Sequence, residues 1–375
     1  MSLDAIVVGL GAVGSAALYQ LARRGARVLG VDRFSPPHAF GSSTGGTRIT
    51  RKAIGEGDEY VPLVLRSYEL FREIEKAAGE RLLTVTGGLW ISSPARQAET
   101  HVANFFDNTL AAARRFRIEH EILPPAEIRR RFPQFRVRDN ECGYYEPDAG
   151  YLRPEACIRA QLALARAHGA EIRVDSPVRS LEDLPSARTV ILAAGAWVRD
   201  FLPPEVAALF KVTRQVQYWF EVPGAVERFM APNFPVWIWE LQDRRNVIYG
   251  FPAIDGAVKV ATEEYAIPVS PEPVEARSGV TEAEQQAMHA DLVAPYLPGV
   301  GPRCVKATSC LYTATPDFGF VVDRHPTHGD VIVASACSGH GFKHSAAVGE
   351  ALAELATEGR SSLDLGKFSL ARFAR

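Results

Sequence analysis

Three glycines near the start of the chain have the spacing of a nucleotide-binding turn. Gly9, Gly11 and Gly14 follow the apolar run 5–8, and Asp32 stands 23 residues after Gly9. In a dinucleotide site the first glycine permits a tight turn, the second lets the backbone approach a pyrophosphate, and the third lets helix and strand pack closely. The acid accepts hydrogen bonds from the ribose hydroxyls. The pattern therefore predicts a dinucleotide site, without distinguishing FAD from NAD.

The elements around these glycines are those of a βαβ unit. Residues 5–8 have the pattern of a buried parallel strand, residues 15–24 that of a helix stopped by Gly25, and residues 27–31 that of a second strand ending at Asp32. This order places the glycine turn between the first strand and the helix, where a phosphate can meet the N-terminus of the helix.

The remaining sequence alternates between two patterns. Segments 154–174, 189–197 and 330–359 combine buried strands, glycines and helices, as in the N-terminal unit. Segments 211–222 and 236–252 alternate polar and apolar residues, which is typical of antiparallel strands joined by hairpins, one of them at residues 242–245.

The predicted fold class is α/β, with a discontinuous Rossmann-like nucleotide-binding domain of the glutathione-reductase type and a second α+β domain built on an antiparallel sheet. The first domain is predicted to comprise residues 1–80, 145–210 and 317–375. The second, which faces the substrate, comprises residues 81–144 and 211–316.

Composition limits the class of partner. The 375 residues are 47% hydrophobic, enough for a large core, and 42 basic against 44 acidic residues leave no charge excess for a nucleic acid or an anionic membrane. We expect a small-molecule ligand. Five cysteines form no CxxC pair, the glycines interrupt the apolar N-terminal run, and no transmembrane segment or metal site is evident. A reduced, cytoplasmic location is predicted.

Five further motifs occur in a characteristic order. They are GSSTGGTRITRKAIGEGDEYVPL (41–63), EPDAGYLRPE (146–155), YGFP (249–252), SCLYTATPD (309–317) and SGHGFK (338–343). With them the chain resembles, over nearly its whole length, the monomeric sarcosine oxidase and N-methyltryptophan oxidase family of FAD-dependent amine oxidases. The resemblance implies an extended FAD, with its adenosine half on the glycine turn and its flavin ring at the junction of the two domains.

The resemblance also implies roles for individual residues. Arg48 lies against the flavin, while Arg51 and Lys343 hold the substrate carboxylate, which a guanidinium can grip through two parallel hydrogen bonds. The helix after Lys343 points its positive end at the flavin. Lys259 lies over the opposite flavin face and helps to activate oxygen. The pocket is walled by Tyr249 and Tyr312. Further cofactor contacts are implied for Arg33, Ser42, Ser43, Thr47, Arg48, Val178, Gly195, Gly339, Gly341, Phe342 and Lys343.

Cys310 is the cysteine for which the resemblance implies a function. It stands in TSCLYT, flanked by polar residues, whereas a space-filling thiol would be expected in an apolar strand. The family match implies a thioether from its sulfur to the 8α-methyl carbon of FAD, formed by a thiolate that Arg48 would help to stabilise. The other four cysteines are expected to be small buried hydrophobic residues: Cys142, Cys157, Cys304 and Cys337.

Two positions depart from the family pattern. Four residues after Lys259, where the named relatives carry a histidine near the substrate, this chain has Glu263, which would attract a cationic amine. Where the family often has a histidine ahead of the first arginine, the chain has Thr44, at a position that the resemblance places near the flavin ring. His340 is expected to order its loop rather than to act as a base. Trp237 and Trp239 share one face of a strand and are expected in the core or the pocket wall.

The implied activity is the oxidation of a secondary, N-methylated amino acid by a monomeric enzyme. The amine gives a hydride to the flavin, the resulting imine hydrolyses to formaldehyde and an amino acid, and oxygen takes the electrons to form hydrogen peroxide. Three alternatives remain open at this stage. The chain could oxidise N-methyltryptophan or a cyclic imino acid such as proline or pipecolate, it could be a flavin-binding subunit without turnover, or it could be an NAD-dependent dehydrogenase.

Overall fold

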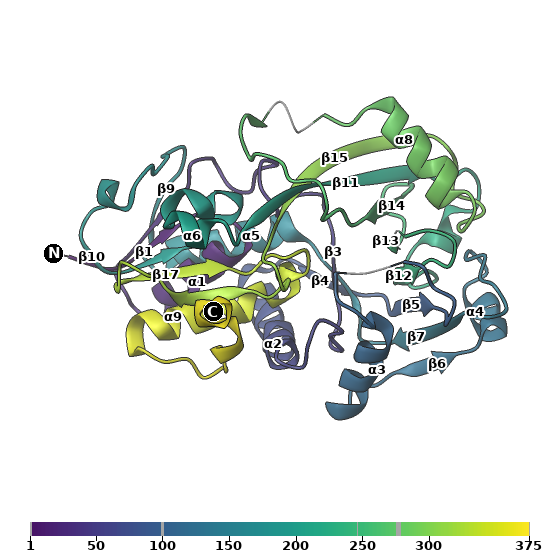
Figure 1. Cartoon of the computed structure of the whole chain (residues 1–375), viewed down its shortest axis with the longest axis horizontal. Coiled ribbons are helices and arrows are strands. Elements are labelled where there is room, and N and C mark those ends of the chain that lie inside the picture. The colour runs from purple at the N-terminus through teal and green to yellow at the C-terminus, as the bar shows by residue number, and fades with distance from the viewer. Residues whose placement is uncertain (1, 99–100, 246, 275–278, 375) are drawn as a thin grey trace.

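A computed structural model describes residues 2–98, 101–245, 247–274 and 279–374. It contains two sheet-based lobes, seen on the left and the right of Figure 1, with the short strand β3 between them. The left lobe is built on a six-stranded sheet with the order β16–β17–β10–β1–β2–β9. Its strands are β1 (Leu3–Val8), β2 (Val28–Val31), β9 (Glu171–Arg173), β10 (Ala187–Leu192), β16 (Val321–Arg324) and β17 (Val331–Ser335).

All neighbours in this sheet pair in parallel, apart from β16 with β17. Because successive side chains of a strand point to opposite faces, β1 contributes to two cores. Ala5 and Val7 pack with the helices of one face, and Ile6 and Val8 belong to a second core on the other face. The helices of the first face are α1 (Ala12–Arg23), α2 (Tyr60–Ala78), α5 (Pro154–Ala167) and α9 (Ser345–Glu358) (Figure 1).

The right lobe is built on an eight-stranded sheet with the order β15–β11–β14–β13–β12–β5–β7–β6. Its strands are β5 (Gly88–Ser92), β6 (Glu121–Leu123), β7 (Cys142–Glu146), β11 (Lys211–Glu221), β12 (Val236–Glu240), β13 (Val247–Gly250), β14 (Ala257–Thr262) and β15 (Cys304–Ala314). Pairing is antiparallel throughout, except that β5 and β12 run parallel.

The alternation of side chains divides this sheet into a core face and a site face. Trp237, Trp239 and Val258 are fully buried in a core that also includes Met288, the last residue of helix α8 (Glu282–Met288). Ile238 lies between the two tryptophans in β12, and Lys259 follows Val258 in β14. Both point to the opposite face of the sheet and line a cavity. The two tryptophans are therefore core residues, as one of the two predicted alternatives stated.

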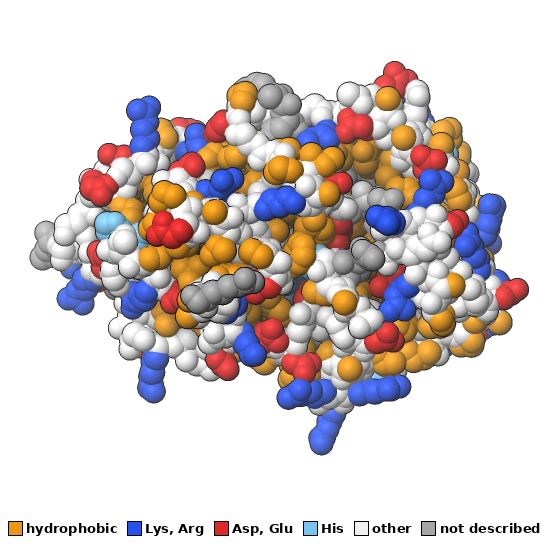
Figure 2. Space-filling view, in the orientation of Figure 1, with side chains coloured by type: hydrophobic (Ala, Val, Ile, Leu, Met, Phe, Trp, Pro, Cys, Tyr) orange, Lys and Arg blue, Asp and Glu red, His pale blue; other side chains and the backbone are white. Residues whose placement is uncertain are grey.

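A three-stranded sheet completes the fold and carries the arginine motif. It consists of β3 (Arg48–Thr50), β8 (Gly150–Leu152) and β4 (Leu83–Val85), all antiparallel. Further α-helices in the described part of the chain are α3 (Phe105–Arg115), α4 (Pro125–Arg131) and α6 (Pro204–Ala207). Among the described residues, no helix combines the length and the apolar character needed to cross a membrane. Figure 2 shows basic and acidic side chains interspersed over one face of the molecule.

The predicted fold class is confirmed, and two details differ. Helix α1 begins at Ala12 rather than Ser15, directly after the glycine turn, and the second sheet contains one parallel pair that the alternating pattern did not predict. The six-stranded sheet draws its strands from 3–31, 171–192 and 321–335, and the eight-stranded sheet from 88–146 and 211–314. The exact domain boundaries stay a prediction.

Candidate active site

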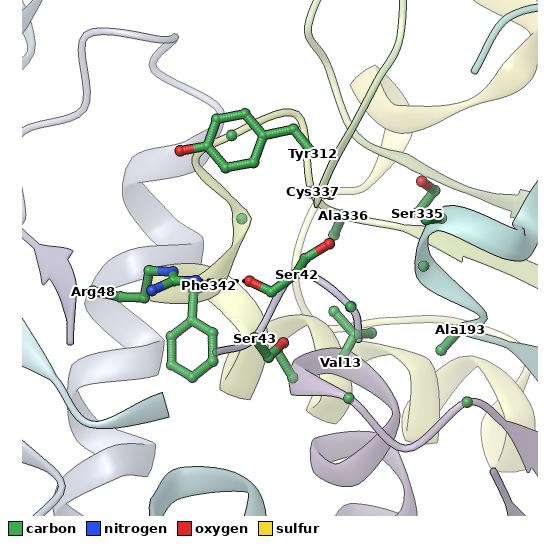
Figure 3. A pocket seen from close by; sticks show the side chains of 18 of the residues that line it. Val13, Ser42, Ser43, Arg48, Ala193, Tyr312, Ser335, Ala336, Cys337 and Phe342 are labelled. Carbon is green, nitrogen blue, oxygen red and sulfur yellow. Dashed lines mark hydrogen bonds between the residues drawn. The ribbon is translucent and has the colours of Figure 1, made fainter. Parts of the chain in front are cut away.

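One elongated cavity runs from the glycine turn after β1 to the site face of the eight-stranded sheet. Its lining includes the loop after β3, the loop after β17 and the start of the segment leading into α9 (Figure 3). All the residues predicted to bind cofactor or substrate contribute to this lining, with the exceptions of Gly14 and Cys310. Segments from distant parts of the chain therefore meet in one space.

The glycine turn forms the first end of the cavity. Gly9 has a φ of +87°, in the left-handed region that favours glycine. A Cβ at Gly14 would lie 1.7 Å from the Gly9 carbonyl oxygen, so this position cannot carry a side chain. At Gly11 the nearest atom to such a Cβ is Ser43 Oγ at 3.8 Å, and the backbone is open to the cavity.

Asp32 lies at the end of β2, beside this turn. Its two carboxylate oxygens accept hydrogen bonds from the backbone N–H groups of Leu10 at 2.7 Å and Phe34 at 2.8 Å. The carboxylate therefore fixes the turn as well as facing the cavity, and each oxygen keeps a further lone pair for a donor such as a ribose hydroxyl.

The loop between β2 and β3 places small residues and Arg48 along the cavity. In Figure 3, Ser42 and Ser43 lie beside Arg48 and Phe342. Arg48 donates to the Ser42 carbonyl at 2.8 Å and to the Thr47 carbonyl at 2.9 Å, so its guanidinium is held by its own loop.

Lys259 is buried on the site face of the eight-stranded sheet and holds the same loop. Its Nζ donates to the carbonyls of Gly45 at 2.8 Å and Thr47 at 2.9 Å, and lies 3.2 Å from Thr47 Oγ1. Burial, and then the positive charge of Arg48, lower the pKa of Lys259 well below its usual value. The site thus holds an amine that is desolvated and fixed in position.

Arg51 and Lys343 meet at the substrate end of the cavity, with a carboxylate between them. Arg51 Nη2 lies 2.6 Å from Glu56 Oε2, and Lys343 Nζ lies 3.6 Å from Glu56 Oε1. All three side chains are at most 4% exposed. Burial raises the pKa of Glu56, but the charges of Arg51 and Lys343 outweigh this effect and hold the pKa well below its ordinary value. The two predicted carboxylate-binding residues therefore already share an internal carboxylate.

Glu146 fixes the backbone on which Arg51 stands. Its buried carboxylate accepts from the backbone N–H groups of Lys52 at 2.6 Å and Ala53 at 3.1 Å, and from the Tyr144 hydroxyl at 3.0 Å. The Lys52 side chain forms an ion pair with Asp148. Arg51 in turn donates from Nε to the Ala53 carbonyl, so its side chain is fixed at both ends.

The two tyrosines predicted to wall the pocket are adjacent. Tyr249 and Tyr312 line the cavity from β13 and β15, and their hydroxyl oxygens are 3.5 Å apart. Burial raises the pKa of both hydroxyls, so they are neutral hydrogen-bonding groups. Glu263, which follows β14, also lines the cavity, and its carboxylate contacts His101.

The cysteines differ from expectation. Cys310 is only 1% exposed, although polar residues flank it, because it lies in the part of β15 from Ser309 to Ala314 in which every residue is buried. Its sulfur accepts from Gln217 Nε2 at 3.1 Å and lies 4.0 Å from Arg48 Nη2. Of the four cysteines expected to be buried, Cys157 is; Cys142, Cys304 and Cys337 are partly exposed, and Cys337 lines the cavity (Figure 3).

The remaining predicted cofactor residues lie along the same cavity. Arg33 and Val178 are near the β2 end, and Gly195 begins the turn Gly195–Phe201 after β10. The other members of this set are Gly339, Gly341 and Phe342, in the segment between β17 and α9. A Cβ at Gly341 would lie 1.8 Å from the Ala336 carbonyl oxygen, which explains the glycine there.

Sequence reasoning missed two residues of the substrate end, Glu56 and His101. Glu56 lies in the motif 41–63, five residues after Arg51. An acid so close in sequence to a predicted carboxylate-binding arginine was the signal that could have identified it. His101 had no such signal, since it reaches the cavity from the loop ahead of α3, 162 residues from Glu263. His340 was identified: its Nε2 donates to the Phe318 carbonyl at 3.1 Å, and burial lowers its pKa to about 3, leaving it neutral.

The lining fits an extended dinucleotide. Gly11 leaves room at the start of α1, whose first N–H groups have no partner within the helix, and Asp32 and Ser43 offer hydrogen bonds beside it. The chain matches the model of the FAD dependent oxidoreductase family over residues 4–355. It belongs to this family, and its cofactor is FAD rather than NAD.

Among the most similar relatives of this chain are amino acid oxidases. The chain is 40% identical to the monomeric sarcosine oxidase of Streptomyces avermitilis, over 99% of this chain and 98% of that protein. It is 35% identical to the N-methyl-L-tryptophan oxidase of Yersinia pestis, over the full length of both. Among solved structures, NikD, an unusual amino acid oxidase of nikkomycin biosynthesis, matches with a TM-score of 0.82, 25% identity and 98% and 97% coverage. The predicted family resemblance is confirmed.

Proposed function

We propose that the protein is an FAD-dependent oxidase of N-methyl amino acids that releases the demethylated amino acid, formaldehyde and hydrogen peroxide. The observation that carries this proposal is the pairing of Arg51 and Lys343 at the end of a cavity whose other end fits a dinucleotide. Two buried cations share one internal carboxylate, so one positive charge remains unbalanced. That charge can bind the carboxylate of an amino acid. The sarcosine and N-methyl-L-tryptophan oxidases among the relatives support the same substrate class.

The chain's own groups bind, orient and shield the substrate. Arg51 and Lys343 hold its carboxylate, and Tyr249 and Tyr312 wall its apolar part and exclude water. Gly11, Asp32 and Ser43 would hold FAD, which would supply a hydride acceptor for the carbon beside the nitrogen and a route for the electrons to oxygen. Lys259 holds its amine in place on the site face of the sheet, and in its protonated form it would stabilise the negative charge that develops during the oxygen step.

A substrate panel tests the proposed function. Purified protein is incubated with N-methyl amino acids, including sarcosine and N-methyl-L-tryptophan, and with proline and pipecolate, and hydrogen peroxide is measured. We expect peroxide from one or more N-methyl amino acids, and none from their methyl esters. Peroxide from proline or pipecolate alone would select the cyclic-imino-acid alternative, and no peroxide from any amine would overturn the proposal.

The charge of Lys343 gives the site a pH dependence. Burial lowers the pKa of Lys343 to about 8, although Glu56 opposes this shift. Below pH 8 the amine is protonated and holds a carboxylate, and above pH 8 that cation is progressively lost. We expect the Kd of methoxyacetate, which carries a carboxylate and no amine, to rise above pH 8. Lys343→Arg should abolish this rise, because a guanidinium stays charged; a flat Kd up to pH 9.5 in the wild type would contradict it.

We propose further that FAD is attached covalently through Cys310. Its sulfur lies beside Arg48, which lines the cavity, although the thiol itself does not. A thioether to the 8α-methyl carbon replaces the S–H bond and one C–H bond, and the two electrons released pass through FAD to oxygen.

Acid precipitation followed by intact mass measurement tests the attachment. The wild type should carry the mass of FAD, Cys310→Ala should lose it, and Cys337→Ala should keep it. Cys337 is the matched control because it is the thiol that lines the cavity. An adduct that survives Cys310→Ala, or an unmodified wild-type mass, would contradict the proposal.

We also propose that the enzyme acts as a monomer in the cytoplasm on a small secondary amine and oxygen, without nucleic acid or membrane partners. The name of the monomeric sarcosine oxidases among the relatives supports the oligomeric state. The near balance of 42 basic and 44 acidic residues supports the absence of polyanionic partners.

A further inference from the structure

His101 and Glu263 form a polar pair in the wall of the cavity. His101 Nδ1 lies 3.3 Å from Glu263 Oε2, and both residues line the cavity. The His101 side chain is 4% exposed and that of Glu263 is 18% exposed. The imidazole is therefore enclosed, while part of the carboxylate faces open space.

The imidazole of His101 is fixed by its surroundings. It stacks on His340, with the ring centroids 5.3 Å apart and the planes 12° apart, and packs against Tyr265 and Phe318. Its Nε2 lies 3.9 Å from Glu56 Oε1 and has no hydrogen-bond partner among the described residues. With Nδ1–H donated to Glu263, the ring holds the carboxylate in one orientation.

The charges around this end are arranged in two groups. The cations Arg51 and Lys343 gather on Glu56, and His340 is neutral. The contact of Glu263 is with His101, and its charge also acts on Lys343, whose pKa it raises against the larger lowering by burial.

We propose that Glu263, held by His101, is the subsite for the substrate's amino group and binds it as a cation. The inference rests on the proposed function, since an amino acid held by its carboxylate at Arg51 and Lys343 also presents a nitrogen. At neutral pH the nitrogen of a secondary amine is protonated and carries N–H donors, which an ionised carboxylate accepts in a charge-assisted hydrogen bond. The enzyme thus takes the zwitterion of its substrate, and the bound nitrogen releases one proton to solvent before the neighbouring carbon gives up a hydride.

Two carboxylate ligands of similar size, which differ in the charge at the position of the amine, test this proposal. N,N-Dimethylglycine has a protonated nitrogen, and methoxyacetate has a neutral ether oxygen at the corresponding position. Calorimetric titration of the FAD-containing enzyme without oxygen gives a Kd for each. We expect the wild type to prefer dimethylglycine, and Glu263→Gln to lower that preference by about tenfold or more, because the glutamine keeps the size but not the charge.

Glu264→Gln is the matched control, since Glu264 is the next residue and its carboxylate accepts from the Ile267 backbone outside the cavity lining. It should leave the preference unchanged. His101→Leu should lower the preference as Glu263→Gln does, His101→Gln should restore part of it by donating to the carboxylate, and adding His101→Leu to Glu263→Gln should have no further effect. The last result identifies His101 as a positioning residue that acts through Glu263.

The outcomes distinguish this inference from the proposed function. If both ligands bind and Glu263→Gln leaves the ratio of their Kd values unchanged, the proposed amine subsite is wrong while the carboxylate site stands. If neither ligand binds the wild type, the carboxylate site and the proposed function fail together.

Discussion

Replacing Lys259 with methionine slows the oxygen-dependent half-reaction by about 10²–10³-fold, the size of the effect expected when one preorganised charged donor is removed from a site. Lys259 is 3% exposed and is held by the Gly45 and Thr47 carbonyls, so solvent does not replace its charge. Because negative charge develops on oxygen only in this step, the amine-dependent half-reaction should change far less. Stopped-flow absorbance of the two half-reactions measures both rates.

A structural role of Lys259 predicts a different pattern. Its hydrogen bonds tie the loop at Gly45 to the sheet, and loosening this loop would displace Arg48, which lines the cavity. Equal slowing of both half-reactions, with loss of bound FAD, would indicate that role instead. Lys306→Met is the matched control, because Lys306 lies over the same Trp219 ring as Lys259 but is exposed. It should leave both rates unchanged.

Replacing Arg51 with methionine raises the KM for an N-methyl amino acid by about 10- to 100-fold. Hydrogen bonds to a charged group contribute about 1.5–3 kcal/mol, and Lys343 retains part of the binding. The esterified substrate, which lacks the charge, should be poor for both enzymes. Equal turnover of acid and ester by the wild type would contradict a carboxylate site at Arg51.

The same substitution also removes the closest partner of Glu56. Breaking a buried ion pair costs about 3–5 kcal/mol, because a carboxylate stays behind without its cation. The Tm of Arg51→Met should therefore fall. Adding Glu56→Gln should recover much of the Tm while KM stays high, since the glutamine needs no counter-charge. Recovery of KM together with Tm would show that Arg51 acts through stability rather than through substrate binding.

The nucleotide end of the site was predictable because its signals are local. The roles of Gly9, Gly11 and Gly14 depend on one turn, and Asp32 ends the very next strand. Period-2 alternation likewise predicted the strand that carries Tyr249. Short-range patterns of this kind survive in the folded structure because each is contained within one supersecondary unit.

The substrate end was less predictable because its contacts join distant segments. His101 meets Glu263 across 162 residues, and its burial depends on His340 and Phe318 from yet another part of the chain. The burial of Cys310 depends on its neighbours in three dimensions, not on the polar residues beside it in sequence. No local pattern encodes such packing.

The most direct test of the account is anaerobic mixing of the purified protein with an N-methyl amino acid while the absorption of the bound FAD is recorded. We expect the yellow absorbance to bleach with a saturable rate, oxygen to restore it, and one equivalent of formaldehyde to appear. A spectrum that stays unchanged with every N-methyl and cyclic amino acid, in protein that contains FAD, would contradict an amine oxidase and leave a flavin-binding protein without turnover.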